Sequence, residues 1–146
     1  ERDAAFFAGE LVRVHGDRIR RWDPDVILPV PLHWRKRWFR GYNQAESIAA
    51  ELGRQMDIRA AADVLVRRRY TAPQKDLDHG RRFSNLRDAI AVRDTLVHQR
   101  PEYHTVLLVD DIYTTGATLE ACAAALSEWG VQQIYFLCLC VGRDCQ

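Results

Sequence analysis

The chain has 146 residues and a formal net charge of +1, and 47% of its residues are hydrophobic while 28% are charged. This balance excludes a disordered or fibrous chain, indicates one globular domain over residues 1–146, and argues against a domain built mainly to hold nucleic-acid phosphates. We also expect a cytoplasmic location, because no apolar run approaches the ~18 residues of a membrane span and no leader pattern opens the chain.

The first predicted elements are a helix and a short strand. Residues 4–21 repeat apolar side chains close to the helical period, which predicts an amphipathic helix. Its apolar positions are Phe7, Leu11, Val14 and Ile19. Residues 25–31, DVILPVP, predict a strand that ends near Val30, because their two prolines exclude a long central strand.

The middle of the chain is expected to hold a second helix and two short strands. Asn43 suits a helix cap and Glu46 completes a capping box with it, so a helix is predicted to begin in NQAESIAAELGRQM. Residues 63–68 and 89–92 are interpreted as strands. Residues 70–85 form a long polar connection between these strands.

The last third of the chain predicts a strand, a helix and another strand. Residues 105–109 suit a parallel strand covered on both faces, residues 119–129 suit a helix ended by Gly130, and VQQIYFLCLCVG supplies the next strand. Strands that alternate with helices predict an α/β fold with a doubly wound, mainly parallel sheet and flanking helices. In such a sheet, ligands bind at the carboxyl ends of the strands.

The cysteines carry no predicted chemistry. They are Cys122, Cys138, Cys140 and Cys145. None forms a C-x-x-C pair or has a histidine at metal-ligand spacing beside it, so we expect no zinc site in this segment. Cys138 and Cys140 lie two residues apart in the last predicted strand and therefore on one face, where burial in the core is the simplest explanation.

The segment VLLVDDIYTTGATLE, residues 106–120, is the strongest candidate for a ligand site. A turn from a parallel strand into a helix exposes backbone N–H groups to an anion. The turn residues are small or carry hydroxyl groups: Thr114, Thr115, Gly116, Ala117 and Thr118. Asp110 and Asp111 would repel a phosphate, so we expect them to accept hydrogen bonds from sugar hydroxyls. A ribose 5-phosphate would supply both the phosphate for the turn and the hydroxyls for the two aspartates.

Other interpretations of this segment have less support. A pair of acids after a strand is most often a solvated turn, and a receiver-type magnesium site would place its acids after the first strand. Neither a P-loop nor a dinucleotide-binding glycine motif occurs in the sequence. Residues 67–93 hold eight Lys or Arg against three Asp, whereas residues 101–146 hold six acids against one Arg. This asymmetry favours an anionic ligand.

The same segment resembles the phosphoribosyl pyrophosphate (PRPP) signature of type I phosphoribosyltransferases, which joins an apolar run, two acids and a Thr- and Gly-rich turn. Two further stretches are similar to the competence protein F (ComF) branch of that superfamily. They are ILPVPLHWRKRWFRGYNQAESIA and the spaced residues Gln74, Leu77, Arg81 and Asn85. Members of this branch commonly carry a zinc-binding segment ahead of the domain, and residues 1–146 do not contain one.

The resemblance implies a pyrophosphate-binding loop after the first core strand. Its residues here would be Leu32, His33, Trp34, Arg35, Arg40 and Gly41. The resemblance also implies a flexible flap over residues 70–85, with functional positions at Gln74, Arg81 and Asn85. The hood that selects the base would come from residues 1–24 or from the end of the chain.

The implied reaction is the displacement of pyrophosphate from C1 of the ribose by a nitrogen nucleophile. Asp110 and Asp111 would be the catalytic residues, because they orient the ribose and offset positive charge on its ring. The implied cofactor is Mg²⁺, held by ligand oxygens and water. No protein side chain is assigned as its direct ligand, although Asp110 and Asp111 can help to place the ion.

Two functions therefore remain open. The first is a phosphoribosyltransferase of nucleotide metabolism that acts on PRPP and an unidentified nitrogenous acceptor. The second is a non-catalytic PRPP- or nucleotide-binding module that serves DNA uptake through a competence protein or single-stranded DNA. The basic and aromatic residues of WRKRWFR, residues 34–40, suit a solvated loop, an anion site or stacked single-stranded DNA. We expect no membrane insertion, and a homo-oligomer is compatible with either function.

Overall fold

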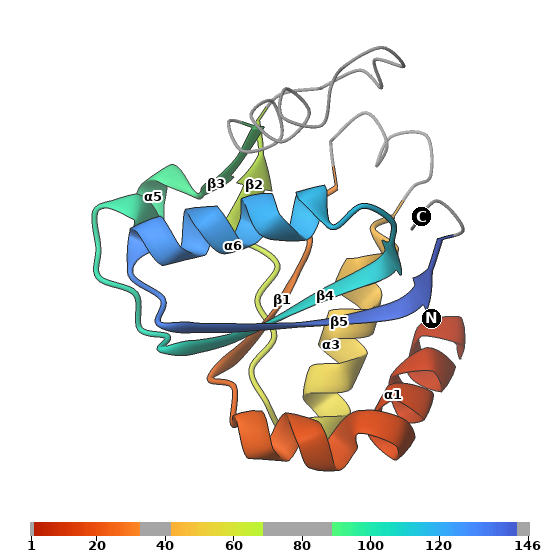
Figure 1. The fold of residues 1–146 in the computed structure, drawn as a ribbon. Helices are drawn as coiled ribbons and strands as arrows, with labels where there is room; N and C mark the ends of the chain where they lie inside the picture. The colour runs from red at the N-terminus through yellow and green to blue at the C-terminus, as the bar shows by residue number, and fades with distance from the viewer. Residues whose placement is uncertain (1, 33–41, 69–88, 143–146) are drawn as a thin grey trace.

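The protein is described by a computed structural model that covers residues 2–32, 42–68 and 89–142 (Figure 1). Its helices are α1 (Arg2–Trp22), α3 (Gln44–Met56), α5 (Asp94–Val97) and α6 (Ala117–Trp129). Its strands are β1 (Val26–Pro29), β2 (Leu65–Arg67), β3 (Ile90–Val92), β4 (Thr105–Tyr113) and β5 (Gln133–Val141). The predicted elements are confirmed, except that the short helix α5 was not expected.

The main sheet is parallel, with β4 at its centre. The strand order is β1-β4-β5, and Val26 of β1 pairs with Val106 of β4. Strands β2 and β3 form a separate antiparallel pair, with Leu65 opposite Val92. The free side of β1 is bonded by residues 59–61, because the Ile27 amide donates to the Arg59 carbonyl at 2.8 Å and its carbonyl accepts from the Ala61 amide at 3.0 Å.

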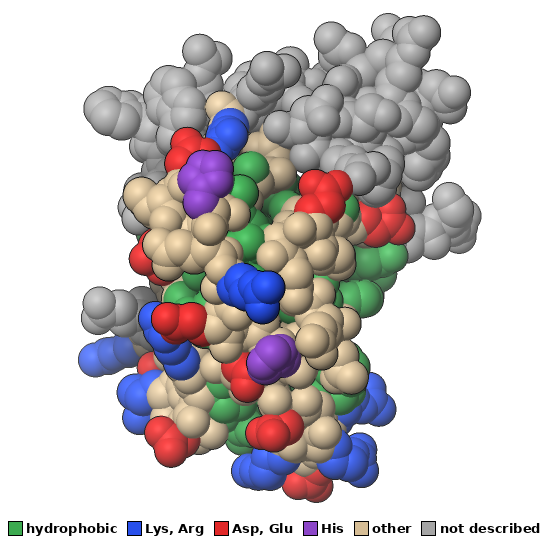
Figure 2. All heavy atoms as spheres, turned by 90° about the vertical axis from the view of Figure 1, so that its left-hand side faces the viewer, with side chains coloured by type: hydrophobic (Ala, Val, Ile, Leu, Met, Phe, Trp, Pro, Cys, Tyr) green, Lys and Arg blue, Asp and Glu red, His purple; other side chains and the backbone are tan. Residues whose placement is uncertain are grey.

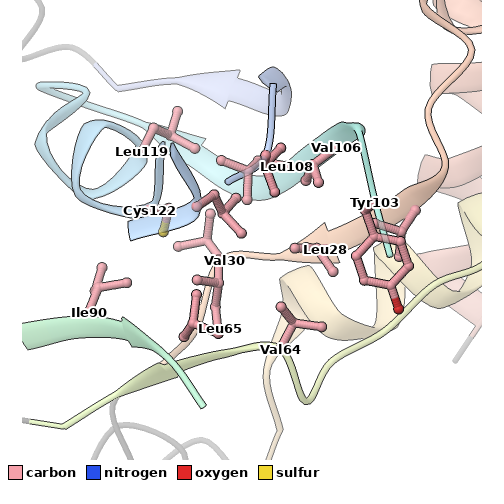
Figure 3. Close-up of a cluster of buried hydrophobic side chains, with 14 of the residues drawn as sticks. Leu28, Val30, Val64, Leu65, Ile90, Tyr103, Val106, Leu108, Leu119 and Cys122 are labelled. Atoms are coloured by element: carbon pink, nitrogen blue, oxygen red, sulfur yellow. The ribbon is translucent and has the colours of Figure 1, made fainter. Parts of the chain in front are cut away.

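Helices cover both faces of the parallel sheet, as a doubly wound fold requires (Figure 1). Alternate residues of β4 point to opposite faces, so Leu107 and Val109 join the core beneath α1 and α3. Val106 and Leu108 join the other core, between the sheet, α6 and the β2–β3 pair. Figure 3 shows this second core, where side chains from all three layers meet.

Helix α1 forms the predicted apolar face at Leu11 and Ile19 but not at Val14. Ala8, Leu11 and Ile19 are buried, whereas Val14 is 58% exposed. The reason is geometric: Val14 lies three residues after Leu11 but is rotated past the edge of the face that packs on α3. At its end, the ring of Trp22 stacks on Tyr135 of β5, with centroids 4.5 Å apart. No helix in the described part of the chain combines the length and hydrophobicity needed to cross a membrane.

The start of α3 is tied to the end of β1. The side-chain oxygen of Asn43 accepts a hydrogen bond from the Ala45 amide at 3.2 Å, which confirms the predicted cap. The amide nitrogen of the same side chain donates to the Val30 carbonyl at 3.2 Å. One residue thus fixes the positive end of the helix beside the carboxyl end of β1.

Strand β4 is longer than predicted. The sequence indicated a strand over residues 105–109 with Asp110 and Asp111 after it, but β4 continues to Tyr113. The extension exists because β5 runs beside it, pairing Asp110 with Cys138 and Tyr113 with Val141. The two aspartates are therefore held on a paired strand rather than on a loop.

The cysteines differ in burial. Cys122 of α6 is buried and Cys138 of β5 is half-buried, whereas Cys140 is exposed. The predicted core burial is therefore wrong for Cys140, whose Sγ lies at the sheet edge and donates to the Asp111 carbonyl at 3.3 Å. Cys145 lies outside the described residues.

Candidate functional site

A cavity of about 520 Å³ opens at the carboxyl ends of β1 and β4. Four segments line it: residues 30–32 after β1, residues 42–44 at the start of α3, Arg67 at the end of β2, and residues 110–118 in part. The N-termini of α3 and α6 thus approach the same cavity from opposite faces of the sheet. Two positive helix ends make the cavity favourable for an anionic ligand.

Asp110 is the most perturbed acid of this site. Its Oδ1 accepts a hydrogen bond from the Asp111 amide at 2.8 Å. Burial raises the pKa of Asp110 to about 7, the neighbouring Asp111 carboxyl adds to the rise, and the positive charge of Arg67 opposes it. Asp110 therefore changes charge near neutral pH, in a site where it can accept hydrogen bonds from a ligand.

Arg67 is a cavity residue that the sequence interpretation missed. Its Nε is fully buried and has no hydrogen-bond partner among the described residues. Burial lowers the pKa of Arg67, and the nearby Asp110 opposes that change. A buried donor left without a partner costs roughly 1–3 kcal/mol, and a functional role is one of the reasons for which a native structure retains one. The alternation of side chains along a strand could have indicated that Arg67 faces inwards. Arg67 comes two residues after the buried Leu65 and therefore lies on the same face of β2.

The turn between β4 and α6 places backbone amides at the start of a helix, where an anion is favoured. Gly116 is the N-cap of α6 with φ 78°, and it offers the helix no side-chain cap. The Ala117 amide donates to the Thr115 hydroxyl at 3.4 Å, and Gly116 adds no side-chain acceptor for the amides that follow. Thr114 and Thr118 line the large cavity, and Gly116 lines a smaller cavity of about 20 Å³ beside it.

The structure brings together a part of the predicted site. The predicted residues that line the large cavity are Leu32, Asp110, Asp111, Thr114 and Thr118. Thr115 and Ala117 lie in the turn without lining either cavity. The remaining predicted residues lie outside the described part of the chain: His33, Trp34, Arg35, Arg40, Gly41, Gln74, Arg81 and Asn85.

The cavity also gains residues that were not predicted to bind a ligand. Tyr42 is 61% exposed at its mouth, and Gln44 lies in the first turn of α3. Helix α1 supplies none of the residues that line the cavity. Within residues 2–32, 42–68 and 89–142, no group of three or more His, Cys, Asp or Glu side chains is placed to hold a metal ion.

Known proteins share this sequence pattern. A family model described as a phosphoribosyl transferase domain matches residues 40–146. The chain is 36% identical to Competence protein F of Haemophilus influenzae over 111 residues, which cover 76% of this chain and 48% of that protein. It is 32% identical to DNA utilization protein YhgH of Escherichia coli strain K12 over 117 residues, which cover 80% of this chain and 49% of that protein. The chain spans about half the length of these curated relatives.

Solved structures share the fold. The purine phosphoribosyltransferase of Pyrococcus horikoshii aligns with a TM-score of 0.58 at 17% identity, over 95% of this chain and 75% of that chain. A hypoxanthine phosphoribosyltransferase of Staphylococcus aureus also gives a TM-score of 0.58, at 15% identity, over 99% of this chain and 66% of that chain. At such low identity, the likeness shows the arrangement of helices and strands and nothing more.

Proposed function

Because the chain belongs to the phosphoribosyl transferase domain family, in its ComF-like branch, we propose that it binds PRPP and transfers the phosphoribosyl group to a nitrogenous acceptor. The observation that carries this proposal is the joining, in one cavity, of a carboxylate pair and a helix start without a side-chain cap. A ribose 5-phosphate presents hydroxyl donors and a phosphate anion to these two groups. Because the chain belongs to this family, we infer that the complete ligand is PRPP, in which pyrophosphate is joined to C1 of the ribose 5-phosphate.

In the proposed complex, the 5-phosphate binds the amides and hydroxyls of residues 114–118, and the 2- and 3-hydroxyls donate to Asp110 and Asp111. The C1–O bond to pyrophosphate breaks and a C1–N bond to the acceptor forms. Pyrophosphate leaves with the bonding electron pair. The carboxylates offset the positive charge that develops on the ribose ring, so they stabilise the transition state more than the bound substrate.

The proposed cofactor is Mg²⁺ bound to the pyrophosphate oxygens, where it would neutralise the charge of the leaving group. The described residues fit an ion held by the ligand and water, because they offer a carboxylate pair but no cage of three or more ligands. Residues 32–35, 40 and 41 as the pyrophosphate site and residues 70–85 as the flap also remain part of the proposal.

The test is a calorimetric titration of PRPP with Mg²⁺, followed by an assay of pyrophosphate release over purine, pyrimidine and ammonia acceptors. We expect saturable PRPP binding that is lost in the double variant Asp110→Asn with Asp111→Asn. Equal PRPP binding by the wild-type and double-variant proteins would remove the assigned site.

A second candidate function is a PRPP-binding module of DNA uptake that does not turn its ligand over. The names of the two curated relatives, Competence protein F and DNA utilization protein, favour it. In that case the partner is a protein or single-stranded DNA. The face in Figure 2 intersperses Lys and Arg with Asp and Glu rather than gathering them in a basic stripe, which favours a protein partner on this face.

PRPP binding without pyrophosphate release over the whole acceptor panel would support the binding module. A salt series on the affinity for single-stranded oligonucleotides separates its two kinds of partner. A steep loss of affinity with salt would indicate DNA, and no binding at low salt would leave a protein.

A further inference from the structure

Arg67 reaches the site from a different sheet. It is the last residue of β2, a strand that pairs with β3 and not with the sheet that carries the aspartates. Its side chain lines the same cavity as Asp110 and Asp111, and its Nε is buried without a partner among the described residues. Among the described residues, no ion pair to the Arg67 guanidinium is present, so its positive charge acts on the groups that line the cavity.

The surroundings of Asp110 show why one cation matters there. Its own strand supplies Asp111, the overlying helix α6 supplies Cys122, and the adjacent strand β5 supplies Cys138. Burial raises the pKa of Cys122 to about 12 and that of Cys138 to about 11, so both thiols are neutral near pH 7. Among the described groups that act on Asp110, Arg67 is the positive one.

We propose that Arg67 is a positioning residue that acts through Asp110, extending towards lower pH the range over which its carboxyl is charged and accepts hydrogen bonds from sugar hydroxyls. This inference rests on the proposed function, because it assigns a role within the same ribose site. The charged form has acceptor sites on both oxygens, whereas the protonated form turns one oxygen into a donor that faces the hydroxyl donors of the sugar. Loss of Arg67 therefore weakens ribose binding at a pH where the wild-type carboxyl is still charged.

The neighbouring residue provides a matched control. Arg68 is also an arginine and directly follows β2, but its guanidinium forms an ion pair with Asp94 of α5 and does not line the cavity. Arg67→Met and Arg68→Met thus remove the same charge from adjacent positions. Arg67→Lys keeps a charge beside Asp110 and tests whether charge alone is sufficient.

The experiment measures the affinity of ribose 5-phosphate by calorimetry from about pH 5.5 to about pH 9 in the wild type and the three variants. The phosphate of the ligand titrates equally in all four proteins, so differences between their profiles report on the protein. We expect Arg67→Met to raise the pH midpoint of binding by about one unit or more, the scale on which a nearby charge moves a carboxyl pKa. Arg67→Lys is expected to restore most of the shift, and Arg68→Met to leave the profile unchanged.

Three outcomes would overturn this inference. The first is an equal loss of affinity at every pH in Arg67→Met, which would mean that Arg67 contacts the ligand directly. The second is an unchanged profile in Arg67→Met, and the third is the same shift in Arg68→Met. If the wild type itself does not bind ribose 5-phosphate, the proposed function fails first, so the two failures are distinguishable.

A measurement without ligand keeps the inference testable if Arg67→Met binds too weakly for calorimetry. The carboxyl carbon of Asp110 can be titrated by NMR, with its signal assigned from the Asp110→Asn variant. The inference requires a higher midpoint in Arg67→Met than in the wild type, with the midpoint of Arg67→Lys closer to that of the wild type. Coincident titration curves in the wild type and both variants would refute it.

Discussion

The hydroxyl of Tyr113 lies 2.8 Å from the point that a Cβ atom on Gly116 would occupy. Two ring carbons of Tyr113 lie 3.2 Å from the same point, and Gly116 has a φ of 78° that other residues rarely adopt. The Tyr113 ring also stacks with that of Phe136, with centroids 6.1 Å apart. The turn before α6 is thus held in a shape that only glycine fits.

We expect Gly116→Ala to weaken ribose 5-phosphate binding at least about tenfold, because the left-handed backbone alone costs about 1–2 kcal/mol with a Cβ and Tyr113 must also move. Isothermal titration measures the loss. Gly16→Ala in α1 is the control, since its Cβ would meet only side-chain atoms, at 3.5 Å. That variant should bind normally and be more stable by about 0.5–1 kcal/mol. Normal binding by Gly116→Ala would contradict the assigned phosphate turn.

A second prediction concerns the pH dependence of stability. Burial raises the pKa of Asp110 to about 7 from an ordinary value of 3.8, so the folded state holds a proton that the unfolded state has lost between these values. The associated stability is complete below about pH 4 and is lost as the pH rises towards about 7. We expect Asp110→Asn to raise the melting temperature at pH 8 and to change it little at pH 4.

Thermal melts of both proteins at the two pH values measure this difference. Asp17→Asn serves as the control, because Asp17 is an exposed residue of α1 whose ion pair with Arg20 lies at the surface. An Asp110→Asn effect that is equal at pH 4 and pH 8 would show that folding does not raise the pKa of Asp110.

The cap of α3 gives a third prediction. Asn43→Ala removes the hydrogen bond to the Ala45 amide and the one to the Val30 carbonyl. We expect it to lower the free energy of unfolding by about 1 kcal/mol or more, as measured in urea. Asn43→Asp keeps the acceptor for the cap but loses the donor to Val30, so it should recover most of the stability. Equal losses in both variants would mean that the bond to Val30 dominates.

A fourth prediction concerns the hydrogen bonds at the amino ends of β1 and β4. Oδ2 of Asp25 accepts hydrogen bonds from the amides of His104 at 2.8 Å and Thr105 at 2.9 Å, which joins the starts of β1 and β4. Asp25→Ala leaves two amides without this partner and should cost about 1–3 kcal/mol in urea unfolding. Asp17→Ala removes an exposed ion pair with Arg20 and should cost less than about 0.5 kcal/mol. Equal costs would indicate that water replaces the Asp25 bonds.

Local signals predicted the parts of the fold that depend on few neighbours. Asn43 caps α3 and Gly130 ends α6 through contacts with residues close by in the chain, so sequence spacing alone revealed them. The turn residues Thr114 and Thr118 could also be predicted, because a strand, a turn and a helix follow each other directly in that part of the sequence. The type of each main element was predictable for the same reason.

Features that depend on distant partners were not predictable in this way. Asp110 lies inside β4 because Cys138, far along the chain, pairs with it. Arg67 joins the site because β2 packs against the face of the sheet beneath α6, and no local pattern encodes that packing. The exposed Val14 has a similar origin, since the placement of α3 decides which side of α1 is covered.

The pairing of β1 with β4 also determines how late in synthesis the parallel sheet can form. Val26 pairs with Val106, which is 80 positions later in the chain. On the other edge of β1, the described backbone partner is residues 59–61, which are synthesised sooner. At roughly 5–20 residues per second, a ribosome needs several seconds to make the intervening stretch. During that time one edge of VILPV, residues 26–30, has no β4 beside it. The nascent chain therefore exposes its most apolar early segment to the translation machinery and its chaperones before the cavity can form.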